Sequence, residues 1–233
     1  MSDIDEIEHL LRLCTPAQRH EIFQQLRQEF TIHPLEQELH ARAEIILGAI
    51  QRAGGLTLRM IRGVIAESAF DVEVVERLKN WESLPVTGDP AYDFVLKDRQ
   101  GEVRLQVKLQ RTKSGQPWLA HQARKAFRSL PPDMFVVETQ KTRGGKTKQT
   151  GAATRPYRFG EFDLLAVATY PSTKRWDAFM YTVADWLIPD PNDPKLIFRY
   201  QPVASTANED WTDQFQTAVK WLRSGQKKTI RAQ

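Results

Sequence analysis

Three residues that could together perform metal-dependent chemistry, Asp93, Gln106 and Lys108, lie within a span of sixteen positions. A carboxylate and an amide oxygen are hard ligands of the kind that Mg²⁺ takes in proteins. A cation held there would polarise a phosphodiester and lower the pKa of a bound water molecule. A neighbouring ammonium group would orient that water or offset the charge that builds up on the phosphate. These residue types therefore predict phosphodiester hydrolysis, provided that the fold brings the three side chains together.

A predicted β-hairpin over residues 92–109 would bring them together. Its two arms alternate apolar and polar residues with the period of two that is typical of a half-buried strand. Residues 98–101, between the arms, are turn formers. If the turn is symmetric, Asp93 faces Gln106, and directly opposed side chains have Cβ atoms only about 5 Å apart. Lys108, two positions further on, points to the same side of the sheet.

A simpler interpretation of the hairpin is that its polar side faces solvent. Lys97 and Glu102 would then form an ordinary cross-strand ion pair. Under that interpretation the polar residues of the hairpin carry no chemistry.

The order of the polar residues favours the chemical interpretation, because it resembles the active-site signature of the PD-(D/E)XK nuclease superfamily. In this sequence the signature reads Asp93 at a strand start, a short hairpin, and then Gln106-Val107-Lys108. Gln106 stands where a carboxylate is usual, as in the Gln variant of the motif, and the Pro-Asp pair is replaced by the reversed Asp89-Pro90. The resemblance covers about residues 63–109.

The resemblance implies a mixed sheet flanked by helices, a bound Mg²⁺ ion, and a Glu on the helix that precedes the Asp strand. Glu67 is the residue at that position. The implied metal ligands are Asp93, Gln106 and Glu67. The implied catalytic residues are these three together with Lys108.

Positive charge is concentrated in the part of the chain that carries this motif. Residues 97–158 contain fifteen Lys or Arg against four Asp or Glu, whereas the net charge of the whole chain is only +4. Clustered positive charge drives binding to the phosphate backbone of nucleic acids. An acidic small substrate could also explain this charge, but it would need fewer positive residues. The charge distribution therefore favours double-stranded DNA as the partner.

Within this part, residues 139–158 form a basic segment with six Lys or Arg and no Asp or Glu. The segment is predicted to be a long loop between two strands, and such loops are usually functional or disordered. The alternative is a solvated loop without a function. Phosphate contacts, which position DNA, are predicted for Lys141, Arg143, Lys146 and Lys148. Contacts that read bases are predicted for Arg155, Tyr157 and Arg158.

Apolar periodicity, caps and breakers predict a mixed α/β fold. Helices are predicted over residues 2–13, 15–30, 35–53, 62–84, 116–130 and 210–222. Strands beyond the hairpin are predicted over residues 134–138, 162–169, 178–183 and 195–200. This order predicts a mixed α+β sheet flanked by helices, a restriction-endonuclease-like core, in residues 55–233. Residues 1–54 are predicted to be an N-terminal helical subdomain.

Composition is that of an ordinary globular protein, with 41% hydrophobic and 27% charged residues in 233. A single cysteine, Cys14, excludes an intramolecular disulfide and a cysteine-based metal cluster. The acidic start lacks the pattern of a signal peptide, and no apolar run approaches the length that spans a bilayer. We therefore expect a cytoplasmic protein without a membrane partner. The sequence contains no Gly-rich phosphate loop, so no nucleotide cofactor is expected.

Together these features predict a Mg²⁺-dependent endodeoxyribonuclease, a type II restriction endonuclease that cuts duplex DNA at a short specific sequence. A homodimer is expected because such cleavage is usually two-fold symmetric. One alternative is a structure-specific repair or recombination nuclease of the same fold. Another is a non-catalytic DNA-binding module, which the neutral Gln106 would favour.

Overall fold

The chain divides into two compact units, Met1–Leu58 and Arg59–Gln233. The computed structural model describes residues 2–30, 33–141 and 155–230. Within these ranges no helix combines the length and the apolar character needed to cross a membrane.

The N-terminal unit is helical. It contains α1 (Asp3–Leu13), α2 (Pro16–Glu29), α3 (Pro34–Glu38) and α4 (Ala43–Arg52). The sequence signals for α2 hold, because Thr15 caps the helix by accepting a hydrogen bond from the Gln18 backbone N–H, and Pro16 occupies the first helical position.

The single helix predicted over residues 35–53 is wrong, since α3 and α4 are separate. The break lies at His40, whose positive φ of 47° a continuous helix cannot contain. The Glu36 carboxylate then accepts a 2.6 Å hydrogen bond from the backbone N–H of Ala43, the first residue of α4. This contact satisfies a helix N-terminal donor and explains why the second helix begins there.

A five-stranded mixed sheet forms the centre of the second unit. Its strands are β1 (Glu82–Leu84), β2 (Phe94–Asp98), β3 (Gly101–Leu109), β7 (Leu164–Ala168) and β8 (Phe179–Val183), in the spatial order β1-β2-β3-β7-β8. All neighbours are antiparallel except β3 and β7, which are parallel. A parallel pair needs a long crossover, and residues 110–163 supply it. The predicted mixed α+β sheet flanked by helices is confirmed.

The predicted hairpin is confirmed in register. Phe94 pairs with Leu105 and Lys97 pairs with Glu102. Gly101 has a φ of +125°, a conformation that only glycine adopts readily, and it follows directly after the turn. Opposed residues therefore match the symmetric turn inferred from the sequence.

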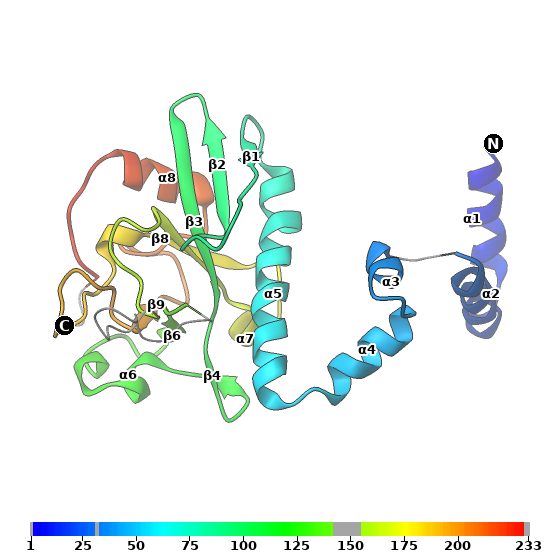
Figure 1. Ribbon diagram of the computed structural model, residues 1–233, viewed down its shortest axis with the longest axis horizontal. Coiled ribbons are helices and arrows are strands. Elements are labelled where there is room, and N and C mark those ends of the chain that lie inside the picture. Colours follow the sequence, from blue (N-terminus) through cyan, green and yellow to red (C-terminus); the bar gives the residue numbers. More distant parts are fainter. Residues whose placement is uncertain (1, 31–32, 142–154, 231–233) are drawn as a thin grey trace. The chain divides into compact units, whose positions relative to one another are not determined.

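Helices α5 (Gly55–Glu73) and α8 (Phe215–Arg223) cover one face of the sheet (Figure 1). Phe70 of α5 lies with its ring 5.3 Å from that of Phe179, and Phe215 of α8 lies 6.1 Å from Tyr181. The ring of Phe70 also approaches Tyr181, at 6.3 Å, so both helices pack on the same side of β8.

The helix predicted over residues 62–84 is wrong at its C-terminal end. Helix α5 stops at Glu73, and a short 3₁₀ turn follows at Val75–Arg77. Asn80 then takes a positive φ of 66°. Residues 82–84 instead extend along β2, where the edge of the sheet offers backbone hydrogen-bond partners. Pairing with a distant strand thus overrides local helix propensity.

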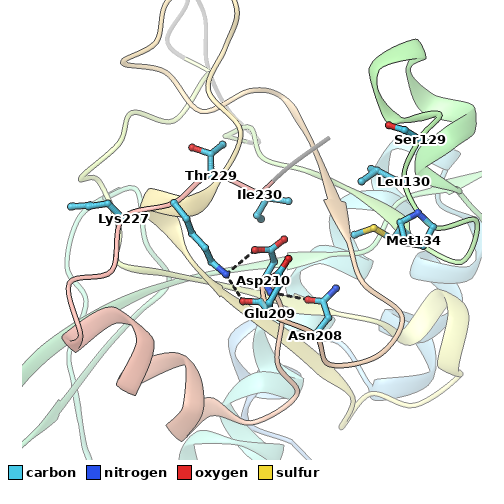
Figure 2. A pocket seen from close by; sticks show the side chains of 11 residues that line it. Ser129, Leu130, Met134, Asn208, Glu209, Asp210, Lys227, Thr229 and Ile230 are labelled. Carbon is cyan, nitrogen blue, oxygen red and sulfur yellow. Dashed lines mark hydrogen bonds and ion pairs between the residues drawn. The ribbon is translucent and has the colours of Figure 1, made fainter. Parts of the chain in front are cut away.

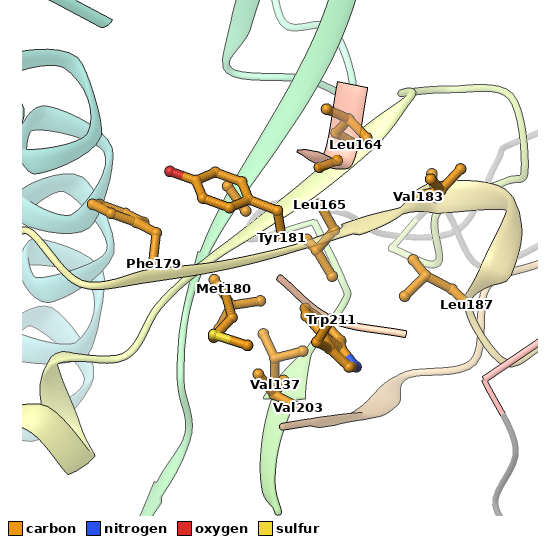
Figure 3. Packing of buried hydrophobic residues seen from close by; sticks show 14 of the residues in the cluster. Val137, Leu164, Leu165, Phe179, Met180, Tyr181, Val183, Leu187, Val203 and Trp211 are labelled. Atoms are coloured by element: carbon orange, nitrogen blue, oxygen red, sulfur yellow. The ribbon is translucent and has the colours of Figure 1, made fainter. Parts of the chain in front are cut away.

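A small two-stranded sheet covers part of the other face. It consists of β6 (Phe135–Glu138) and β9 (Tyr200–Val203), which are antiparallel. Figure 3 shows Met180 of β8 pointing toward Val137 and Val203 of this small sheet, and all three belong to one buried core. Because side chains alternate along a strand, Gln106 and Lys108 of β3 lie on the same face as Met180.

The helix predicted over residues 116–130 is wrong. The segment begins in a short hairpin of β4 (Thr112–Lys113) and β5 (Gln116–Pro117), turned by Ser114 and Gly115 with positive φ. Backbone pairing with β4 holds Gln116 and Pro117 in an extended conformation at the start of the segment. Only α6 (Ala120–Ala123) and a 3₁₀ turn at Lys125–Phe127 follow.

The remaining strand predictions differ in accuracy. Strands β6, β7 and β8 lie where the sequence predicted them, but the last strand begins at Tyr200 instead of Lys195. The remaining short elements are α7 (Tyr170–Thr173) and a 3₁₀ turn at Ala184–Trp186.

Candidate active site

The carboxylate of Asp93 is held by the neighbouring arm of the hairpin. Its backbone N–H donates to the Leu105 carbonyl at 2.8 Å, which continues the pairing just beyond β2. Its Oδ2 atom accepts two hydrogen bonds, from Gln106 Nε2 at 2.5 Å and from the Val107 backbone N–H at 2.8 Å. No described residue donates to Oδ1 of Asp93, so this oxygen remains available to a ligand.

The orientation of the Gln106 amide follows from its partners. Nε2 donates to Asp93 Oδ2 and also lies 3.2 Å from the Val107 carbonyl oxygen. Both partners are acceptors, so the amide nitrogen must face them. Within the described part of the chain, Oε1 of Gln106 has no hydrogen-bond donor and could act as a ligand oxygen. Gln106 therefore orients Asp93 with one atom and offers an oxygen with the other.

Glu67 reaches the same place from α5. Burial raises the pKa of the Glu67 carboxyl to about 7, with a further rise from the charge of Asp93 and an opposing effect from Lys108. Burial also raises the pKa of Asp93, against the charge of Lys108 and the hydrogen bonds from Val107 and Gln106. Burial lowers the pKa of Lys108, against the two carboxylates. The three charged groups are thus close enough to alter one another's ionisation.

The four predicted catalytic residues line one pocket. Its volume is about 160 Å³, the share of liquid taken by roughly five water molecules. Its walls consist of Glu67, Asp89, Pro90, Asp93, Gln106, Lys108, Lys141 and Tyr157. Sequence reasoning did not place Asp89 in the site, although its position four residues before Asp93 could have indicated it.

Lys141 and Tyr157, two residues of the basic segment that were predicted to contact DNA, also lie in this pocket. Tyr157 is buried, with only 3% of its surface exposed, and the ammonium of Lys141 forms a 2.9 Å ion pair with Glu161. Arg155 and Arg158, by contrast, are exposed. Arg143, Lys146 and Lys148 lie outside the described residues.

A larger cavity, of about 570 Å³, lies elsewhere, between the loop before β6 and the C-terminal segment (Figure 2). Its main cation, Lys228, is already engaged by the Asp210 carboxylate at 2.8 Å and by the Glu209 carbonyl oxygen. None of the four predicted catalytic residues lines this cavity. The smaller pocket is therefore the candidate active site.

Comparisons with known proteins give little further guidance. No family model matches the chain, and no curated protein matches it. In structure the chain is similar to a bacterial homing endonuclease, I-Ssp6803I, over 71% of this chain and 92% of that one, with 16% sequence identity and a TM-score of 0.38. A likeness this distant assigns neither a family nor an activity to the chain.

The pKa of Glu67 predicts a pH-dependent effect of Glu67→Gln on stability. Folding raises this pKa from 4.5 to about 7, so the wild-type protein loses stability as the pH rises through that window. A full shift corresponds to about 3.4 kcal/mol, and partial exposure reduces it to about 1–2 kcal/mol. In EDTA, Glu67→Gln should therefore raise the free energy of unfolding by about that amount at pH 8 and by much less at pH 5. An equal gain at both pH values in urea titrations would contradict a charge-based cause.

The hydrogen bond between Gln106 and Asp93 predicts the effect of Gln106→Glu. The substitution puts two carboxylates in contact, and the pair repels unless a proton or a cation lies between them. In EDTA at pH 8 the variant should lose about 2–3 kcal/mol of stability. Added Mg²⁺ should raise its melting temperature more than it raises that of the wild type.

A matched control for Gln106→Glu is Gln110→Glu. Gln110 follows directly after β3 and is equally buried, at 2% exposure, but it lies outside the pocket. This control should lose stability without any added response to Mg²⁺. Equal responses to Mg²⁺ in the two variants would place the cation away from residue 106.

Proposed function

We propose that this protein is a Mg²⁺-dependent endonuclease that hydrolyses phosphodiester bonds in double-stranded DNA at a short specific sequence, in the manner of a type II restriction endonuclease. The observation that carries the proposal is the convergence of Asp93, Gln106, Lys108 and Glu67 on one pocket. These residues stand in the order that resembles the PD-(D/E)XK signature in its Gln variant. Carboxylates, an amide oxygen and an ammonium are the groups that this reaction requires.

The residues of the pocket suit Mg²⁺, which needs few protein ligands, better than a cation that needs many. Within the described ranges no three His, Cys, Asp or Glu side chains are grouped as a metal site. The available ligands are the carboxylates of Asp93 and Glu67 and the amide oxygen of Gln106. Mg²⁺ commonly binds through one or two carboxylates and keeps several waters. When bound, it would polarise the phosphodiester and lower the pKa of an attacking water.

The protein's own groups would then act in three ways. Gln106 and the Val107 N–H hold Oδ2 of Asp93 by hydrogen bonds. The same two bonds fix the orientation of the carboxylate, and so the position of Oδ1. Glu67 would reach the cation directly or through a water molecule. Lys108 would orient the attacking water or offset negative charge as it grows on the phosphate. Its position beside both carboxylates supports this role.

The charge distribution supports DNA as the substrate. Arg155 and Arg158 are exposed, and no carboxylate pairs with either side chain within the described ranges. Arginine in such a position can engage guanine through two hydrogen bonds. Lys146, Lys148 and Arg143 would add phosphate contacts. Two copies of the chain would be needed to cut both strands of a symmetric site.

The decisive experiment is digestion of phage DNA by the purified protein, with Mg²⁺ in one reaction and EDTA in the other. Discrete fragments that require Mg²⁺ support a sequence-specific endonuclease. Cleavage restricted to flaps or junctions would replace the proposal with a repair or recombination nuclease.

The neutral Gln106 favours one second candidate, a DNA-binding module without catalysis. A carboxylate at this position would bind a cation more strongly than an amide does. Binding of duplex DNA without cleavage in Mg²⁺ or Mn²⁺ would favour this module over the nuclease.

A further inference from the structure

The ring of Tyr157 lies against two ammonium groups of the pocket. The Nζ atom of Lys108 is 5.5 Å from the ring centroid, and the Nζ atom of Lys141 is 5.6 Å from it. Cations within about 6 Å of an aromatic face are attracted by its quadrupole, and more strongly where water is excluded. Tyr157 is only 3% exposed. One buried ring thus contacts both lysines of the site.

The ring of Tyr157 is held in place by its surroundings. It packs edge-on against Phe162, with the centroids 5.3 Å apart and the planes at 84°. The Tyr157 carbonyl accepts a 2.8 Å hydrogen bond from the Ile197 N–H. The Lys141 N–H donates to the Arg155 carbonyl, also at 2.8 Å, so the backbones of the two segments that carry the ring and this lysine are paired.

The two lysines have different neighbours. Lys108 lies among the carboxylates of Asp93 and Glu67, which offset its charge. Lys141 instead pairs with Glu161 at 2.9 Å, and about a third of its side chain, 32%, is exposed. The other oxygen of Glu161 accepts a 2.9 Å hydrogen bond from the Arg158 N–H, so this carboxylate is fixed too. An ammonium has three donors, and Lys141 therefore retains donors for an incoming anion.

We propose that Tyr157 is a positioning residue that holds both ammonium groups at the pocket, and that Lys141 binds a phosphate group of the DNA strand there. Lys108 lies beside the carboxylates, where the reaction would take place, while Lys141 would hold a phosphate group of the strand. The sequence pattern assigned Tyr157 to base contacts on an exposed loop, but its burial between two cations gives it this different role. The inference rests on the proposed function and adds a phosphate-binding group to that site.

The role of Lys141 can be tested by measuring DNA binding without cleavage. The affinity of a fluorescent duplex would be measured in EDTA across salt concentrations for the wild type, Lys141→Met and Lys97→Met. Lys97 is the control because it is an exposed lysine of β2 outside the pocket and pairs only loosely with Glu102, at 3.8 Å. Lys141→Met should weaken binding about tenfold and reduce the log–log salt slope by about one. Lys97→Met should leave both unchanged, and identical behaviour of the two variants would overturn the proposal.

The role of Tyr157 can be tested by comparing Tyr157→Phe with Tyr157→Leu. The Phe variant keeps the ring face and should bind and cut DNA nearly as the wild type does. The Leu variant keeps an apolar side chain without the ring, so its KM should rise as in Lys141→Met and its kcat should fall as well. A Phe variant as defective as the Leu variant would overturn the proposal that the ring of Tyr157 positions the two lysines. If Tyr157→Leu fails to fold, the Phe and Lys141→Met results still decide.

The outcomes separate this inference from the proposed nuclease activity. A wild-type protein that binds DNA but never cuts it contradicts the nuclease, while the Lys141 comparison still stands on binding alone. A wild-type protein that cuts DNA, with Lys141→Met binding equally well at the same salt slope, contradicts only this inference. Absence of any DNA binding by the wild type would overturn both.

Discussion

Asp93→Asn is expected to abolish DNA cleavage while leaving DNA binding intact. Oδ2 of Asp93 accepts from both Gln106 and Val107, so the single oxygen of an Asn would take that position. The amide nitrogen would then face the cation, which requires oxygen ligands. The cleavage rate should fall by at least about 10³-fold, the upper end of the cost of losing one electrostatic group. Affinity for duplex DNA in EDTA should change little, because no phosphate contact is lost.

A matched control for Asp93→Asn is Asp98→Asn, at the other end of β2. Asp98 pairs with Arg223, with the closest contact at 2.6 Å, and lies outside the pocket. Asp98→Asn should cut DNA at the wild-type rate, at a temperature where both variants are folded. Normal cleavage by Asp93→Asn would move the metal site away from the start of β2.

Lys108→Met should lower the cleavage rate by about 10²–10³-fold. Methionine keeps the length and the packing of the lysine stem but removes the charge. Removal of this cation should also raise the pKa of Asp93 and Glu67 further, because its charge opposes both rises in the wild type. The defect should therefore be partly relieved at higher pH or higher Mg²⁺ concentration, where the carboxylates ionise and bind the cation.

Measurement of cleavage rate against pH for Lys108→Met, wild type and Lys97→Met would test this expectation. DNA affinity should be nearly unchanged in Lys108→Met, because the two carboxylates offset the charge of Lys108 until negative charge grows on the phosphate in the transition state. If Lys108→Met cuts at a normal rate at every pH, Lys108 is only a charge that balances its neighbours.

The part of the site that could be predicted from the sequence is the part built from local pairing. A hairpin with a short turn fixes its own register, because the length of the turn sets which residues oppose one another and a one-residue slip would move the apolar side chains to the other face. The opposition of Asp93 and Gln106 followed from that register. Glu67 was placed by resemblance to a family pattern, and the pocket contains it.

The part that escaped prediction depends on contacts between distant segments. Lys141 and Tyr157 both line the pocket although they lie far from Asp93 and Gln106 in the sequence, and no local pattern predicts such long-range packing. The helix predicted over residues 62–84 failed for a similar reason, since residues 82–84 found backbone partners on β2. In residues 116–130 the cause is local, since the β4–β5 hairpin, turned by Ser114 and Gly115, holds residues 116–117 extended where a helix was predicted to begin.

The parallel pairing of β3 with β7 has a consequence for the order of folding. Strand β3 meets β2 across a two-residue turn, but it meets β7 only after residues 110–163 have been traversed. Closing so long a loop costs chain entropy before any contact repays it, which slows folding. We expect Asp93 and Gln106 to come together while the hairpin forms, on a timescale of about microseconds. Lys141 and Tyr157 belong to the segment that packs late. A chain that has formed the hairpin but not yet paired β3 with β7 would therefore join Asp93 to Gln106 and still lack the phosphate-binding group, Lys141.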